Sequence, residues 1–98
     1  MSDIETAKEM LARSAFTCVL CKGDVVYTST KHGVAPLLEW IDSGKDLQGF
    51  SAADKVVGKA AALLFILTRV TEIYAPIMSE TAIYEFSKLE SSILAMPG

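Results

Sequence analysis

The first third of the chain changes from a helical to a strand-like hydrophobic period. Four apolar residues at helical spacing predict a first helix with Asp3 as its N-cap: Ile4, Ala7, Met10 and Leu11. Farther along, Phe16 to Cys21 and Val25 to Thr28 are rich in residue types that favour strands. Lys22-Gly23-Asp24 between them supplies the glycine that a short hairpin loop needs. We therefore predict an antiparallel pair of strands after the first helix.

The middle of the chain predicts two more helices. A short amphipathic helix has Pro36 in its first turn and ends at Ser43-Gly44. The segment Phe50–Leu67 then opens polar and becomes apolar on every side, which predicts a helix covered all round by a sheet and other helices. Ser51 is its expected N-cap and Asp54 the capping-box partner of Ser51. Gly58 would lie within this helix, where a close backbone approach would explain its cost.

The remaining elements complete an α/β fold. Val70 to Ala75 predicts a strand that the preceding helix connects in parallel, so the sheet is expected to be mixed. Pro76 ends this strand and Ser79 is the expected N-cap of a fourth helix. Five residues form the predicted buried face of that helix: Ala82, Ile83, Phe86, Leu89 and Ile93.

Composition narrows the class of protein. Ninety-eight residues, 51% of them hydrophobic, fit a single domain covering residues 1–98. The longest apolar run, Ala60 to Leu67, is far shorter than the roughly 20 residues that span a bilayer, so no membrane association is expected. The first ten residues, MSDIETAKEM, lack the features of a signal peptide, which favours the cytoplasm. A net charge of −3 with dispersed lysines and arginines disfavours nucleic acid as a partner.

Cysteine and histidine offer little for catalysis or metal binding. Cys18 and Cys21 lie three apart on a predicted strand and should therefore point to opposite faces of the sheet, with a zinc knuckle at the hairpin tip as the alternative. His32 is the only histidine, so four soft ligands for zinc are not available, and we expect neither a metal nor a cofactor. We interpret His32 as a solvated loop residue beside Gly33, with contact to a ligand as the alternative.

The polar start of the third predicted helix is the best candidate for a binding site. Lys55 and Lys59, four apart, would lie on one helix face near the helix N-terminus, together with its free backbone amides. Such an arrangement suits an anion, although solvation or pairing with acids would explain both lysines equally well. Ser79 and Glu80 would lie near the same carboxyl edge of the sheet, where their alternative role is helix capping.

The order of elements, together with four segments, resembles a known family: TCVLCKGDVVYTS, GVAPLLEWI, GKDLQGFSAADKVVGKAAALL and EIYAPIMSE. The chain is similar over roughly residues 10 to 90 to the DUF1893 family of uncharacterised prokaryotic proteins, whose fold is similar to that of cytidine deaminases. The resemblance implies a three-layer α/β/α structure with a mixed sheet of order 2-1-3-4-5. It also implies further strands after the fourth helix, which would leave an open sheet edge at Val70–Ala75. Either a strand from a partner, such as a second copy, covers this edge, or the chain is shortened at its C-terminus relative to the family.

The residues that carry zinc catalysis in deaminases are absent from this chain. Cytidine deaminases have a His or Cys and then Ala-Glu where we align Ser51-Ala52-Ala53-Asp54. They have Pro-Cys-x-x-Cys where this chain has Pro76-Ile77-Met78-Ser79-Glu80. Without the metal no hydroxide nucleophile forms at neutral pH, so we do not expect zinc-dependent deamination.

Three functions remain open at this point. The first is binding of a small anionic or nucleotide-like ligand, and the residues expected to form its site are Ser51, Asp54, Lys55, Lys59, Ser79 and Glu80. The second is an interaction module that forms homo-oligomers through the open sheet edge. The third is a metal-free enzyme that uses Asp54 and Lys55 as an acid–base pair.

Overall fold

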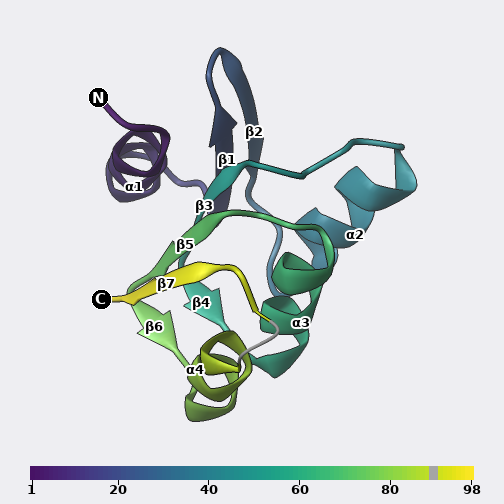
Figure 1. Ribbon diagram of the computed structural model, residues 1–98. Helices are drawn as coiled ribbons and strands as arrows, with labels where there is room; N and C mark the ends of the chain where they lie inside the picture. The colour runs from purple at the N-terminus through teal and green to yellow at the C-terminus, as the bar shows by residue number, and fades with distance from the viewer. Residues whose placement is uncertain (89–90) are drawn as a thin grey trace.

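The computed structural model describes residues 1–88 and 91–98, and its centre is a five-stranded mixed sheet of order β2-β1-β3-β5-β7 (Figure 1). Its strands are β1 (Cys18–Lys22), β2 (Val25–Ser29), β3 (Ser51–Asp54), β5 (Glu72–Ala75) and β7 (Leu94–Pro97). β1 is antiparallel to both of its neighbours, whereas β3, β5 and β7 run parallel. If the two strands of the small second sheet are set aside, this is the 2-1-3-4-5 order that the resemblance implied.

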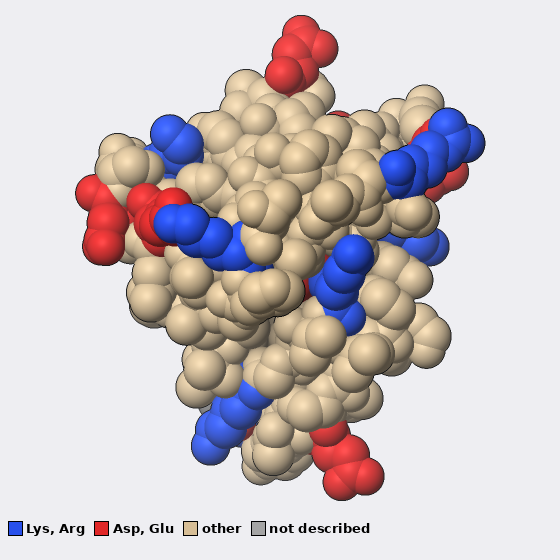
Figure 2. Space-filling model, turned by 180° about the vertical axis from the view of Figure 1, so that it is seen from behind, with Lys and Arg blue, Asp and Glu red and all other residues tan. Residues whose placement is uncertain are grey.

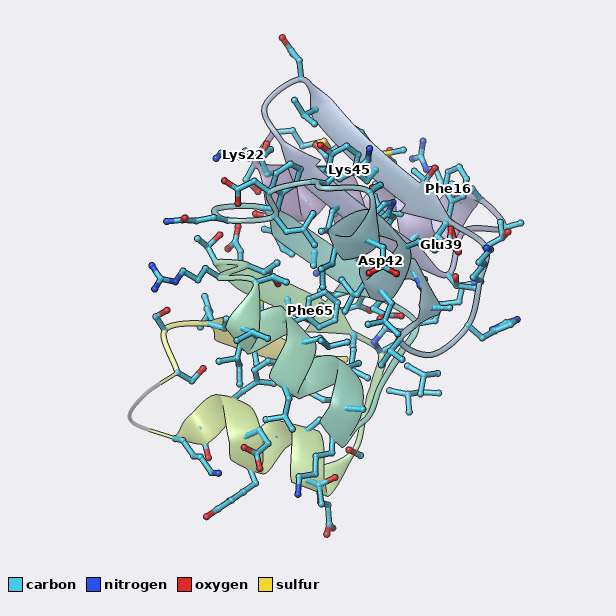
Figure 3. The ribbon with its side chains drawn as sticks, turned by 90° about the vertical axis from the view of Figure 1, so that its right-hand side faces the viewer. Phe16, Lys22, Glu39, Asp42, Lys45 and Phe65 are labelled. Atoms are coloured by element: carbon cyan, nitrogen blue, oxygen red, sulfur yellow. The ribbon has the colours of Figure 1, made fainter. Side chains whose placement is uncertain are left out.

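Helices cover both faces of the sheet and give the predicted three layers (Figure 1). α1 (Asp3–Arg13) packs on one face, where Ala7 and Leu11 meet Val19 and Ala53. The helices α2 (Ala35–Asp42), α3 (Lys59–Leu67) and α4 (Glu80–Ser87) lie on the other face over the larger core. Phe65 of α3, labelled in Figure 3, is fully buried in this core.

The predicted first helix, hairpin and second helix are confirmed with small shifts. The N-cap of α1 is Ser2 rather than Asp3, because the Ser2 side chain accepts the backbone N–H of Glu5. Asp3 instead accepts the backbone N–H of Gly23 at the tip of the hairpin, at 3.2 Å. Gly23 has a φ of 59°, the left-handed conformation for which the loop needs a glycine.

The prediction of a single helix over Phe50–Leu67 is wrong. This segment forms β3, then the two-residue strand β4 (Val56–Val57), and only then α3. Ala52 and Ala53 are fully buried on opposite faces of a central strand, paired with β1 on one side and β5 on the other. Small side chains suit a strand that is covered on both faces, and this burial outweighs the helix propensity of alanine. Ser51 and Asp54 are therefore strand residues and not helix caps.

Because α3 begins only at Lys59, Gly58 and the surface of α3 have roles different from those predicted. Gly58 is the N-cap of α3, and a Cβ atom built on it would meet nothing within 4 Å, so no close backbone approach explains it. The apolar helix is also not covered all round. Leu63 is 45% exposed and Leu67 is 76% exposed, whereas Phe65 is fully buried.

The predicted open edge at Val70–Ala75 is covered by the chain itself. β7 pairs in parallel with β5 along its whole length, from Glu72 opposite Leu94 to Ala75 opposite Pro97. The predicted parallel crossover from β3 to β5 is confirmed. After Pro76, the short strand β6 (Ile77–Met78) pairs in parallel with β4 in a separate sheet. β2 and β7 are thus the edge strands of the main sheet.

The fourth helix begins where the sequence predicts. The Ser79 hydroxyl accepts the backbone N–H of Ala82 at 3.0 Å and caps α4. Ala82 and Phe86 are buried, but Ile83 is 43% exposed and does not belong to the buried face. Ile93 is buried beyond the end of α4, and Leu89 lies outside the described residues. In the part of the chain that the structure describes, no helix has the length and apolar character to cross a bilayer.

Candidate functional site

Asp54 is a buried carboxyl group at the carboxyl end of β3, only 6% exposed. It lies opposite Cys18 of β1 in the strand register. Burial raises the pKa of this carboxyl from its ordinary 3.8 to about 7, although hydrogen bonds from the backbone N–H groups of Val56 and Lys55 act in the opposite direction. Asp54 forms no ion pair within residues 1–88 and 91–98. A carboxyl of this kind can be neutral or charged near neutral pH.

Asp54 opens onto a cleft of about 360 Å³, which we call the Asp54 cleft. Its walls come from the bend after β3 and from the segments before β1 and after β2, and the lining residues are Ala15, Thr17, Thr30, His32, Gly33, Asp54, Lys55 and Val56. Gly33 turns the chain with a φ of 63° and places exposed His32 at this opening. The Thr17 hydroxyl donates to the carbonyl oxygens of Ser29 and Lys31. The side chains of His32 and Thr30 have no partner among residues 1–88 and 91–98 and can meet a ligand.

Lys55 connects this cleft to a larger one on the α1 face of the sheet. The second cleft, which we call the α1 cleft, has a volume of about 570 Å³ and also contains Lys8, Tyr74 and Pro76. Lys8 Nζ lies 4.5 Å from the centroid of the Tyr74 ring, a cation–π contact at the wall of the cleft. The backbone of Lys55 is fixed on both sides, since its N–H donates to the Thr17 carbonyl and its carbonyl accepts from Ile77 N–H. Lys55 therefore lines both openings, and its backbone is fixed between them.

The structure brings Asp54 and Lys55 together but places Ser51 elsewhere. Ser51 is at the opposite end of β3, and its buried hydroxyl donates to Glu72 Oε2 at 2.6 Å. Three residue steps along a strand separate Ser51 from Asp54, about 10 Å. Ser51 is consequently part of the sheet and does not line the Asp54 cleft.

Lys59, Ser79 and Glu80 lie at two helix starts that the small sheet holds together. β4 and β6 pair in parallel and lead directly into α3 and α4 (Figure 1), and Ser79 N–H donates to the Val57 carbonyl at 3.0 Å. The predicted pair of lysines on one helix face is wrong, because Lys55 lies before β4 and only Lys59 is helical. None of these three residues lines the Asp54 cleft, so their part in ligand binding stays a prediction.

The two cysteines point to opposite faces of the sheet, as their spacing on a strand predicts. Cys18 belongs to the core under α2 and α3, whereas Cys21 packs beneath α1. Both thiols are free, and burial together with the charge of Asp54 raises the pKa of Cys18 well above its ordinary value. Within residues 1–88 and 91–98, no three His, Cys, Asp or Glu side chains gather as metal ligands.

Surface charge on the rear face of the molecule is mixed. Figure 2 shows basic and acidic side chains scattered among large areas of other residues, with no continuous field of one sign. Recognition of a ligand on this face would therefore depend on local groups and not on a broad basic surface. From the sequence, contact with a ligand was only the alternative role of His32, and Thr30 was not selected. The one sequence feature that could have indicated either residue is its position in a loop that contains Gly33.

Comparison with known proteins gives a consistent family assignment. The family model described as a domain of unknown function (DUF1893) matches residues 6–93. The crystal structure of a DUF1893 family protein, TM1506, from Thermotoga maritima is similar with a TM-score of 0.81 and 22% sequence identity. The match covers 95% of this chain and 63% of that protein, so this chain spans less than two thirds of its length. At this identity the likeness shows a shared fold. No curated protein matches the chain.

Proposed function

The chain belongs to the DUF1893 family, and because that assignment leaves the activity open, we propose from the geometry that it binds a small anionic or nucleotide-like molecule at the Asp54 cleft. The observation that carries this proposal is the combination of a buried carboxyl and an adjacent ammonium group in one opening. Lys55 supplies a cation for a phosphate or carboxylate group. Asp54 supplies a hydrogen-bonding group for a hydroxyl or amino group of the same ligand.

The location supports the same conclusion. The cleft lies at the carboxyl end of β3, beside the start of β1 and the end of β2, and the carboxyl ends of parallel strands are where open α/β sheets place their ligands. Its volume of about 360 Å³ falls within the range of small-molecule sites, and the adjoining α1 cleft offers further space beyond Lys55. A ligand larger than a single nucleotide unit could reach both clefts across Lys55. We also propose that the fold is of the cytidine deaminase type and that the protein does not use zinc catalysis.

A screen by thermal shift tests whether such a ligand exists. Nucleosides, nucleoside monophosphates and inorganic phosphates are added separately, and the melting temperature is recorded over a range of concentrations. A ligand that binds only the folded state at one hundred times its dissociation constant stabilises the protein by about 2.7 kcal/mol. A concentration-dependent rise with phosphate-bearing ligands supports the proposal. A flat response to every member of the panel contradicts it.

A second candidate function is metal-free acid–base catalysis with Asp54 as the proton-transfer group. The observation in its favour is the pKa of Asp54, about 7, which suits proton transfer near neutral pH. Lys55 would then stabilise negative charge on the substrate. Turnover of a nucleoside or nucleotide that wild-type protein performs and Asp54→Asn does not would support this function. Binding without turnover would contradict catalysis and agree with ligand binding as the function.

A further inference from the structure

Arg69 has an unusual backbone conformation at the end of α3. Its φ is 62°, and it is the one non-glycine residue with a positive φ in the described ranges 1–88 and 91–98. In this left-handed region the Cβ atom of an ordinary residue crowds the backbone, so glycine is strongly preferred. The glycines with positive φ in this chain all lie in turns or loops, as expected.

Neighbouring hydrogen bonds fix this conformation. Arg69 N–H donates to the Ile66 carbonyl at 3.1 Å, and Val70 N–H donates to the Phe65 carbonyl at 3.4 Å. These two bonds form a Schellman motif that ends α3, and its left-handed position is the one most often occupied by glycine. The Arg69 carbonyl also accepts Gly49 N–H at 3.0 Å, which ties the motif to the chain entering β3. Arginine at this position carries a steric cost in the left-handed conformation that glycine would avoid.

The guanidinium group of Arg69 has no partner among the residues that the structure describes. It forms no hydrogen bond or ion pair with another described residue, and it is exposed. Arg69 borders two adjoining clefts, one of about 330 Å³ beside the loop after α2 and one of about 500 Å³ beside the segment before β7. No described contact within the protein therefore accounts for an arginine here.

The groups around Arg69 suit an oxyanion. Gln48 borders both clefts, Ser92 borders the larger one, and neither side chain has a partner in the described part of the chain, so both can donate hydrogen bonds. Lys45, which follows α2 in Figure 3, also lines the smaller cleft, but its ammonium group lies 5.2 Å from the centroid of the Tyr27 ring. Asp46 in the smaller cleft accepts the backbone N–H of Gln48 at 3.0 Å and keeps its negative charge, whereas no described acidic residue lines the larger cleft, which therefore suits the anion better. A guanidinium with amide and hydroxyl donors is an arrangement that binds phosphate or carboxylate.

We propose that Arg69, with Gln48 and Ser92, binds an anionic phosphate or carboxylate group at the end of α3. This location borders the segment that enters β3, whereas the Asp54 cleft lies at the carboxyl end of that strand. The inference is thus independent of the proposed function. It assigns a second anion-binding position to the protein.

Arg69→Gly is a sharp test because it removes the charge and relieves the backbone together. The variant should fold and melt several degrees higher, because glycine adopts the left-handed conformation without steric cost. Inorganic phosphate and acetate are titrated separately, and backbone amide shifts of Gly49, Arg69 and Ser92 are followed by NMR. We expect binding of at least one of these anions, weakened about tenfold or more by Arg69→Gly.

Two control variants separate charge loss from other effects. Arg13→Gln removes one positive charge from an exposed position in the last turn of α1 and should leave the dissociation constant of the anion unchanged. Lys55→Ala should also leave it unchanged, which separates this site from the Asp54 cleft. Stronger binding of phosphate than of acetate assigns a phosphate-bearing ligand, and the reverse assigns a carboxylate. An equal dissociation constant in wild type and Arg69→Gly would overturn the proposal, as would the absence of amide shifts with both anions.

Discussion

The hydroxyl of buried Ser51 donates a hydrogen bond of 2.6 Å to Oε2 of Glu72, across the parallel pair β3 and β5. This contact makes Ser51 a structural residue of the sheet. We expect Ser51→Ala to lower the free energy of unfolding by about 1–3 kcal/mol, because Glu72 loses a donor in a partly buried position. Urea unfolding measures the change. The matched control is Ser87→Ala at the exposed end of α4, and an equal cost for both variants would argue against a structural role.

Asp54 should make stability depend on pH. Its pKa is about 7 in the folded protein, above its ordinary 3.8, so the folded state holds the proton more tightly. The stabilising contribution is fully present below about pH 4 and is lost as the pH rises through 7, on the order of 4 kcal/mol at most. We expect the difference in unfolding free energy between wild type and Asp54→Asn to shrink, or to reverse in favour of Asn, over that range.

Denaturant unfolding at pH 4, 6 and 8 measures this dependence. Asp42→Asn, at an exposed position of α2, is the matched control for the same substitution. A constant difference between wild type and Asp54→Asn would show that the carboxyl titrates as in water.

Gly58→Ala distinguishes the observed start of α3 from the helix predicted for Phe50–Leu67. At the N-cap, alanine is much poorer than glycine, so we expect the variant to lose on the order of 1 kcal/mol of stability. In the middle of a helix the same change would gain roughly that amount. The sign of the change in melting temperature is therefore sufficient, and an increase would contradict the assignment of Gly58 as the cap.

The local period of the sequence is enough to predict α1, the hairpin, α2 and α4. It fails over Phe50–Leu67 because Ala52 and Ala53 form a strand that exists only through its two neighbours in the sheet. β7 was missed because its four residues, ending in a proline, carry little strand signal without β5 beside them. Both failures concern contacts between segments distant in sequence.

The sequence predicts two residues of the Asp54 cleft, Asp54 and Lys55, but for a reason that the structure shows to be wrong. Asp54 and Lys55 were selected as residues of a helix start, yet they share a cleft because β3 ends there. The sequence groups Lys59 with Lys55 by helical spacing, but Lys55 lies before β4 and only Lys59 belongs to a helix. Arg69 gave no signal, because a left-handed position that is not occupied by glycine cannot be recognised from the residue type.

Homo-oligomerisation stays a prediction, now with a different edge. β5 is covered by β7, whose own edge ends in a proline. The other edge strand, β2, contains no charged residue or proline and exposes Val25 and Val26 by 46% and 40%. If copies pair there, sedimentation over a dilution series will show a dimer that Val26→Lys abolishes. A monomer at all concentrations would count against self-association.

The central claim, an anion-binding function at the Asp54 cleft, is tested most directly by calorimetric titration of a nucleoside monophosphate, AMP, into wild type, Lys55→Ala and Lys59→Ala. Both lysines are exposed and each substitution removes one charge, but only Lys55 lines the Asp54 cleft. The predicted result is binding that weakens about tenfold or more in Lys55→Ala and changes less than about twofold in Lys59→Ala. Equal affinities in all three proteins, or a loss confined to Lys59→Ala, would contradict it.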